Sequence, residues 1–175
     1  MSRGYIHLYT GDGKGKTTAA MGVILRANGS GKRTVLVQFL KGRETGEIEA
    51  LKSLENITVL RHTRDFGFFI SASDKDKEEI INQNNANLLE ASRLANAGLC
   101  DLLVLDEICA AYTNNALDTE LADKLIKEKP ISLELVLTGR SAPLHFIEHA
   151  DYVTELVKHK HPYDEGVKAR KGVEF

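Results

Sequence analysis

The sequence predicts an α/β fold, a mainly parallel sheet with helices on both faces, and three observations predict it. Apolar, strand-like runs alternate with helical patterns from end to end. A glycine-rich loop separates the first apolar run from the first helical pattern. The length of 175 residues suits one compact domain with a sizeable core. We therefore expect residues 1–175 to form a single domain.

The strands are expected where Val, Ile, Leu and Tyr gather in short runs bounded by turn residues. The first covers residues 5–9, and the later ones cover 33–39, 57–60, 101–106, 133–138 and 152–157. The run at 101–106 is the most apolar of them, so we expect helices to cover both of its faces.

The helices are expected between these runs, at 18–27, 46–54, 75–97 and 117–129. Gly98 stands where a glycine commonly ends a helix, and Asp118 stands near the start of the last one. Ligands of such sheets bind at the carboxyl ends of the strands. Four segments should therefore line one crevice, namely 10–18, 38–42, 106–107 and 138–140.

The glycine-rich loop has the composition of a phosphate-binding P-loop, which makes the predicted fold P-loop NTPase-like and RecA-like. Glycines let its backbone approach phosphate oxygens, and the following helix N-terminus offers free N–H groups. Lys16 would reach the outer phosphates, and Thr17 would face a magnesium ion. Thr10 fills the slot that the strict pattern gives to its first glycine. The predicted phosphate-binding residues are Thr10, Gly11, Asp12, Gly13, Lys14, Gly15, Lys16, Thr17 and Thr18.

Asp106 and Glu107 end a buried strand, where acidic residues commonly hold or orient magnesium beside a triphosphate. Which carboxylate touches the metal stays open at this point. Glu107 could equally act as a general base for water in an ATPase. The pair could also simply cap the next helix.

Two arginines are candidates for phosphate contacts. Arg140 directly follows a strand and could clamp a phosphate in bidentate fashion, or it could be a surface arginine in a turn. Arg26 lies about two turns into the first helix, where a solvated side chain is the ordinary interpretation.

Residues 66–70 read Phe-Gly-Phe-Phe-Ile in a place where polar loop residues are expected. They either pack into the core or form an aromatic wall for a large, flat, apolar ligand. His159 and His161 indicate a metal only weakly, because a one-residue gap without a nearby cysteine favours a solvated strand end.

Composition excludes some partners. A formal net charge of −2 gives no electrostatic footprint for nucleic acid, and no apolar run approaches membrane-spanning length. Cys100 and Cys109 lie in apolar surroundings without a Cys-x-x-Cys pair. That pattern favours two reduced, buried thiols in a cytoplasmic protein.

Together these segments resemble the ATP:corrinoid adenosyltransferases of the CobA/BtuR/CobO type, the cob(I)alamin adenosyltransferases. The segments that carry the resemblance are 10–20, 37–42, 46–47, 104–107, 138–140 and 157–169. It implies transfer of the 5′-deoxyadenosyl group from ATP to the cobalt(I) of a corrinoid such as cobalamin or cobinamide, with release of triphosphate. The acceptor could also be an earlier intermediate, cob(I)yrinic acid a,c-diamide, and the role could be biosynthesis or salvage of adenosylcobalamin.

The resemblance also implies roles for single residues. Lys16, Thr17 and Glu107 would be the catalytic residues, with Thr17 and Glu107 as the Mg²⁺ partners. Arg26 matches a phosphate-contacting arginine. Phe68 matches an aromatic residue that lines the corrinoid pocket in the family. Two residues later, relatives carry a tryptophan where this chain has Ile70, so either Ile70 or its neighbour Phe69 would take the role of that tryptophan.

The resemblance further implies a homodimer and a reduced flavoprotein as electron donor. Two other functions compete with it on the sequence alone. One is a RecA-like P-loop ATPase or phosphotransferase, and the other is a nucleotide-binding regulatory module without turnover.

Overall fold

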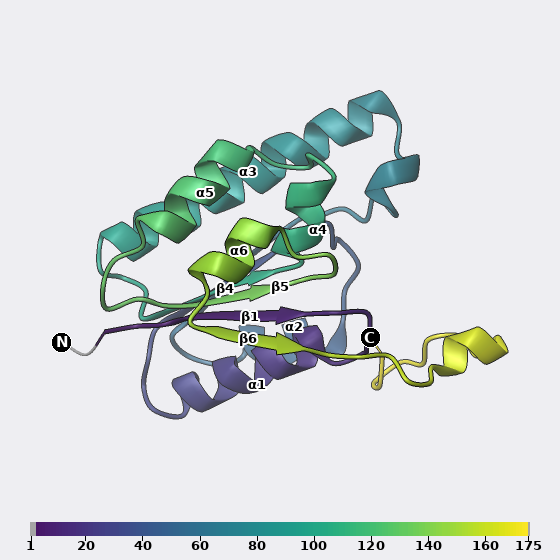
Figure 1. Ribbon diagram of the computed structural model, residues 1–175, viewed down its shortest axis with the longest axis horizontal. Helices are drawn as coiled ribbons and strands as arrows, with labels where there is room; N and C mark the ends of the chain where they lie inside the picture. Colours follow the sequence, from purple (N-terminus) through teal and green to yellow (C-terminus); the bar gives the residue numbers. More distant parts are fainter. Residues whose placement is uncertain (1–2, 175) are drawn as a thin grey trace.

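The computed structural model describes residues 3–174, and its centre is one six-stranded sheet in which all strands run parallel (Figure 1). The strands are β1 Ile6–Thr10, β2 Thr34–Gln38, β3 Ile57–Arg61, β4 Leu102–Asp106, β5 Glu134–Thr138 and β6 Tyr152–Glu155. Their spatial order is β3-β2-β4-β5-β1-β6. The expected sheet is therefore confirmed, and each expected strand lies within two residues of its observed bounds.

Helices cover both faces of the sheet, as predicted (Figure 1). One face carries α1 Lys16–Asn28 and α2 Gly46–Lys52, and the other carries α3 Asp74–Asn96, α4 Ile108–Thr113, α5 Thr119–Lys127 and α6 Leu144–His149. Successive residues of a strand alternate between these two layers because side chains in a strand point to opposite faces. In β4, Leu103 and Leu105 join the core under α3, whereas Leu102 and Val104 join the core under α1.

Helix ends follow the chemistry that the sequence predicts. Ser73 accepts a hydrogen bond from Asp76 N at the start of α3, and Asp118 accepts two from backbone N–H groups at the start of α5. Gly98 follows α3 with φ +67°, the left-handed conformation that favours glycine. Two short helices, α4 and α6, were not predicted.

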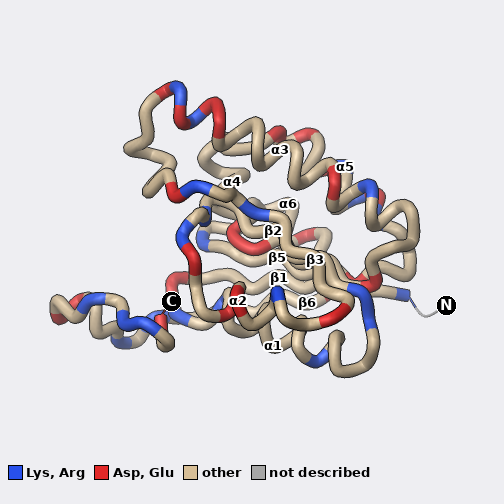
Figure 2. Tube along the Cα trace, turned by 180° about the vertical axis from the view of Figure 1, so that it is seen from behind, with Lys and Arg blue, Asp and Glu red and all other residues tan. Residues whose placement is uncertain are grey.

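The chain after β6 forms a tail that leaves the body of the domain and returns to it (Figure 1). It contains a 3-10 turn, Pro162–Glu165, and closes onto the glycine-rich loop where Glu174 pairs with Lys14 at 2.9 Å. Figure 2 shows acidic and basic residues close together at the outer end of α3 and in this tail. Across residues 3–174, no helix combines the length and the apolar character needed to cross a bilayer.

Candidate active site

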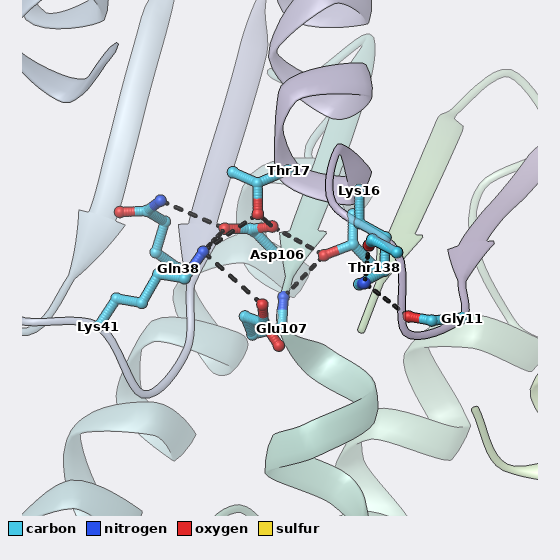
Figure 3. Close-up of polar contacts among 9 residues, drawn as sticks. Gly11, Lys16, Thr17, Gln38, Lys41, Asp106, Glu107 and Thr138 are labelled. Carbon is cyan, nitrogen blue, oxygen red and sulfur yellow. Dashed lines mark hydrogen bonds and ion pairs between the residues drawn. The ribbon is translucent and has the colours of Figure 1, made fainter. Parts of the chain in front are cut away.

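The sheet order brings the predicted site segments together. Strands β2, β4, β5 and β1 are neighbours, and their carboxyl ends all point to one edge. Along that edge lie Gln38, Asp106, Thr138 and the glycine-rich loop, in that spatial order (Figure 3). The prediction that these four segments line one crevice is confirmed at the level of direct side-chain contacts.

Asp106 is the centre of this edge. Its carboxylate is fully buried, and four side chains donate hydrogen bonds to it. Oδ1 accepts from Thr17 Oγ1 at 2.9 Å and from Thr138 Oγ1 at 2.7 Å. Oδ2 accepts from Lys41 Nζ at 2.8 Å and from Gln38 Nε2 at 3.3 Å. A buried carboxylate is stable only with such partners, so these contacts fix its position and that of the Thr17 hydroxyl.

The glycine-rich loop curls around the Lys16 ammonium. Lys16 Nζ donates to the carbonyl oxygens of Gly11 at 2.6 Å and Gly13 at 2.8 Å, and the residue is 8% exposed. The loop is pressed against the chain after β6, where Gly13 N donates to Leu156 O at 2.6 Å. A Cβ on Gly11 or Gly13 would lie within 2.6 Å of that carbonyl oxygen. The glycines are therefore required by the packing of the loop itself.

The charges around Lys16 favour an anion in front of the loop. Burial lowers the pKa of Lys16, and the positive charge of Arg140 lowers it further, against the opposing effect of Glu107 and Asp12. The first turn of α1 holds no acidic residue, and its leading N–H groups lack partners within the helix. A polyphosphate placed there would relieve both conditions.

Glu107 has an unusual backbone that aims it at the same edge. Its φ is +64°, a left-handed value that is rare for a residue with a side chain, and its N–H donates to Thr138 Oγ1 at 2.9 Å. Its carboxylate makes no capping hydrogen bond to α4 and lies 3.8 Å from Lys41 Nζ. Helix capping therefore does not explain this residue.

Lys41 is the site residue to which sequence reasoning gave no role. It follows β2 and donates to Thr17 Oγ1 at 3.1 Å as well as to Asp106. Burial lowers the pKa of Lys41, but Asp106 and Glu107 outweigh burial and raise it. The sequence placed the segment 38–42 at the crevice because it follows an apolar strand, but it gave no sign of which side chain in that segment would contact Thr17 and Asp106.

Two cavities flank the phosphate loop. The first, called here the Lys41 cavity, has a volume of about 400 Å³ and lies between Thr17, Lys41, Glu47 and tail residues Val173 and Glu174. The second, called here the Phe68 cavity, has a volume of about 550 Å³ and is lined by Asp12, Phe68, Arg140, Lys158, His161 and Tyr163. Arg140 is thus brought to the loop, with an exposed side chain.

The aromatic segment divides between the two predicted alternatives. Phe69 packs against the core, whereas Phe68 and Ile70 are 86% and 77% exposed. Phe66 stacks edge-on against His62 and lies 4.6 Å from the guanidinium carbon of Arg64. The exposed apolar surface therefore belongs to Phe68 and Ile70.

The remaining candidates lie elsewhere. The exposed side chain of Arg26 lines a cavity at the amino edge of the sheet, beside Gly4 and Asp101, and ten residues of helix separate it from Lys16, about 15 Å. The structure does not bring Arg26 to the phosphate loop of the same chain, so the phosphate contact of Arg26 stays a prediction.

Gly139 packs closely against α4. A Cβ on Gly139 would lie 2.6 Å from Cys109 Cβ, so this position requires a glycine for the packing of α4.

The two cysteines are buried, as the sequence predicts, and His161 has a local structural contact. Cys100 and Cys109 are buried and free, and burial raises their thiol pKa values to about 11 and about 12. His161 accepts a hydrogen bond from Tyr163 N and so starts the 3-10 turn of the tail. Within residues 3–174, no cluster of three His, Cys, Asp or Glu residues could hold a metal.

A strand, a glycine-rich loop and a helix, with a buried strand-end aspartate facing the loop threonine, define a P-loop nucleotide-binding protein of the RecA-like α/β class. The crystal structure of a KaiC-like protein from the archaeon Pyrococcus horikoshii supports this fold. Its TM-score is 0.52 at 19% identity, with 91% of this chain and 75% of that chain covered.

Sequence comparisons identify the family. The family model described as "ATP:corrinoid adenosyltransferase BtuR/CobO/CobP" matches residues 2–175. A corrinoid adenosyltransferase of Pseudomonas aeruginosa is 37% identical over 175 residues, covering 99% of this chain and 84% of the relative. The corrinoid adenosyltransferases of Escherichia coli K12 and Salmonella typhimurium, the latter named CobA, are 34% and 33% identical, each covering 99% of this chain and 86% of the relative. The chain belongs to the ATP:corrinoid adenosyltransferase family.

Proposed function

We propose that this chain transfers the 5′-deoxyadenosyl group of ATP to the cobalt(I) of a corrinoid, such as cobalamin or cobinamide, and releases triphosphate. Family membership supports this function. The structural observation that carries it is the buried Lys16 ammonium, held at 2.6 and 2.8 Å inside a loop of backbone amides that opens onto α1. That loop is a binding site for a polyphosphate, here a leaving group.

The transfer forms one bond and breaks one. The electron pair of cobalt(I) forms the bond to the ribose C5′, and the C5′–O pair departs with the triphosphate. The cobalt nucleophile carries no proton, so no general base is required. The chain contributes alignment of the two substrates and stabilisation of the charge that grows on the triphosphate, chiefly through Lys16.

The residues around Asp106 fit a magnesium ion. Magnesium prefers oxygen ligands and usually takes one or two from the protein. The oxygens of Thr17 and Asp106 already hold a cation, because the Lys41 ammonium lies 3.1 Å from Thr17 Oγ1 and 2.8 Å from Asp106 Oδ2. Glu107 Oε1 lies 3.8 Å from the same ammonium. Thr17 and Glu107 would hold the ion with help from Asp106. When bound, it would neutralise negative charge on the triphosphate.

The Phe68 cavity is the proposed corrinoid side of the site. It adjoins the phosphate loop at Asp12 and carries an aromatic ring that is 86% exposed. A corrinoid is large, flat and largely apolar at its faces, so it would cover that ring. Because Phe69 packs into the core, Ile70 is the residue left to take the part of the family tryptophan.

Three wider features are proposed with this function. We propose a cytoplasmic location, which the supply of the proposed substrate ATP in that compartment supports. The homodimer and the reduced flavoprotein donor follow from the family resemblance. A dimer is tested by sedimentation equilibrium, and a donor by its ability to replace a chemical reductant.

One experiment separates the proposed function from its alternatives. The protein is mixed anaerobically with ATP, Mg²⁺ and chemically reduced cob(I)alamin, and both the visible spectrum and the phosphate products are followed. We expect light-sensitive adenosylcobalamin and an equal amount of triphosphate. ADP and orthophosphate without an organometallic product would instead identify a RecA-like ATPase or phosphotransferase. Saturable ATP binding without any product would identify a regulatory module.

A further inference from the structure

The Lys41 ammonium occupies a position that three proposed metal-binding residues surround (Figure 3). Its Nζ donates to Asp106 Oδ2 at 2.8 Å and to Thr17 Oγ1 at 3.1 Å, and it lies 3.8 Å from Glu107 Oε1. A positive charge among a hydroxyl and two carboxylates is the arrangement that a divalent cation would itself need. The ammonium therefore stands where a metal ion would compete with it.

The buried carboxylate explains why a cation is present there. Asp106 is 0% exposed, and an unpaired carboxylate in that environment would be strongly destabilising. Thr17, Thr138 and Gln38 supply neutral hydrogen bonds, whereas Lys41 supplies the positive charge. Without a metal, the charge balance of this edge depends on the lysine.

The surroundings of Lys41 give its side chain somewhere to go. The side chain is 32% exposed and borders the Lys41 cavity, which Glu47 also lines. Its neighbour Leu40 holds φ +58°, a left-handed value that a change of loop conformation would relieve. The ammonium can thus leave Asp106 without entering the core.

We propose that Lys41 is a displaceable counter-cation, which neutralises Asp106 while no metal is bound and is expelled toward the Lys41 cavity when a divalent cation binds. This inference rests on the magnesium site of the proposed function. The cation and the ammonium exclude each other because both require the oxygens of Thr17 and Asp106. Once expelled, the ammonium lies beside the phosphate loop, where an incoming polyphosphate would receive it.

The test uses Mn²⁺ alone as the probe, on the full chain without ATP or corrinoid. Thermal unfolding is measured in a chelator and in millimolar Mn²⁺ for the wild type, Lys41→Met and the matched control Lys32→Met, whose lysine lies at the amino edge. In the chelator we expect Lys41→Met to lose about 4 °C or more in Tm. We expect Mn²⁺ to restore most of that loss and to change the other two proteins little.

A direct binding measurement gives the second readout. The electron paramagnetic resonance signal of free Mn²⁺ reports the bound fraction, and we expect Lys41→Met to bind the ion about 10-fold more tightly than the wild type. Equal or weaker binding, or equal stabilisation of both proteins by Mn²⁺, would overturn the proposal. If Lys41→Met does not fold, Lys41→Gln keeps a donor for Asp106, lacks the charge and enters the same comparison. Failure here leaves adenosyl transfer standing, because neither readout involves ATP or a corrinoid.

Discussion

The two ends of β4 carry the same side chain in opposite circumstances. Asp101, just before the strand, forms two side-chain hydrogen bonds with the exposed Arg33, at 3.0 Å from Nε and 2.8 Å from Nη2. Asp106, the last residue of the strand, is fully buried and accepts hydrogen bonds from four side chains. Four residues of β4 separate a surface ion pair from the centre of the candidate active site.

Access of water explains the difference in what the two aspartates do. Around Asp101, water competes with every contact and screens the charge, so the pair with Arg33 contributes little. Around Asp106, no water replaces a lost partner, so each hydrogen bond positions its donor as well as satisfying the carboxylate. The ion pair at the amino edge of the sheet is therefore a surface contact between the residue before β4 and the residue before β2. The contacts at the carboxyl edge hold the side chains of Thr17 and Lys41 in place in the candidate active site.

The largest expected effect lies at the carboxyl edge and comes from Lys16→Ala. Removing the buried ammonium takes away the charge nearest the leaving triphosphate, so adenosyl transfer should fall by about 10² to 10³-fold. Formation of adenosylcobalamin, followed by its absorbance, measures this. Lys32→Ala, at the amino edge, is the control and should stay within about threefold of the wild type. Comparable rates for all three proteins would show that the loop does not hold the leaving group.

Asp106→Asn and Asp101→Asn make the same change at the two ends of β4. An amide at position 106 presents an N–H₂ group to at least one donor, so we expect a loss of about 3 kcal/mol in the free energy of unfolding. Adenosyl transfer at limiting Mg²⁺ should fall with it, because the carboxylate charge beside the proposed ion is removed. Asp101→Asn should cost several times less stability and leave the rate unchanged. Urea unfolding measures the stability of both variants, and the rate assay measures their adenosyl transfer. Equal losses of stability in the two variants would show that burial does not distinguish Asp106 from Asp101.

Most of the fold could be predicted because strands and long helices repeat an apolar pattern over several residues. Each strand was placed within two residues, and Asp118 and Gly98 act at helix ends as expected. The helices α4 and α6 were missed, since six residues hold too little periodicity to distinguish a helix from a loop. Neither has a side-chain cap, so the usual start signal is absent as well.

The site could be predicted in outline because parallel strands end at one edge of a sheet, which predicts that Thr17, Asp106 and Glu107 lie close together. Lys41 and Glu174 could not be assigned from sequence. The contact of Lys41 depends on a loop with a left-handed residue at Leu40, and the contact of Glu174 with Lys14 depends on the path of the tail. For Arg26 the phosphate contact stays a prediction, because this side chain lines a cavity at the amino edge of the sheet.

Phe68 and Phe69 extend the comparison to neighbouring residues, one exposed and one packed. Phe68→Ala removes a ring that touches little, so stability should stay unchanged while the KM for corrinoid rises about 10-fold. Phe69→Ala removes part of the core packing and should cost about 2 kcal/mol, less than a fully buried phenylalanine because the ring is half-buried. Urea unfolding and steady-state kinetics distinguish the two variants. A loss of stability in Phe68→Ala with an unchanged KM for corrinoid would show that the corrinoid does not bind at the Phe68 cavity.

The smallest expected effect is the acid dependence of the amino edge. Hydrogen bonds from Arg33 lower the pKa of Asp101 from 3.8 to about 2. A carboxylate with a lowered pKa in the folded state stabilises the protein fully above its unfolded pKa, and this contribution is lost as pH falls toward the folded value. The stability difference between the wild type and Asp101→Asn should therefore be constant near neutral pH and shrink between about pH 4 and pH 2. Added salt should reduce it as well, because the pair is exposed.

Urea unfolding of both proteins across that range measures the difference directly, and Arg33→Gln provides the partner control. If Arg33 causes the lowered pKa, the stability difference between the wild type and Arg33→Gln should shrink over the same pH window, and a further Asp101→Asn change should alter the stability of Arg33→Gln little. A difference that persists undiminished at pH 2 would mean that the carboxylate charge contributes nothing at this end of β4. The contrast with Asp106 would then rest on charge, because both aspartates would act through hydrogen-bond geometry and only Asp106 through its charge as well.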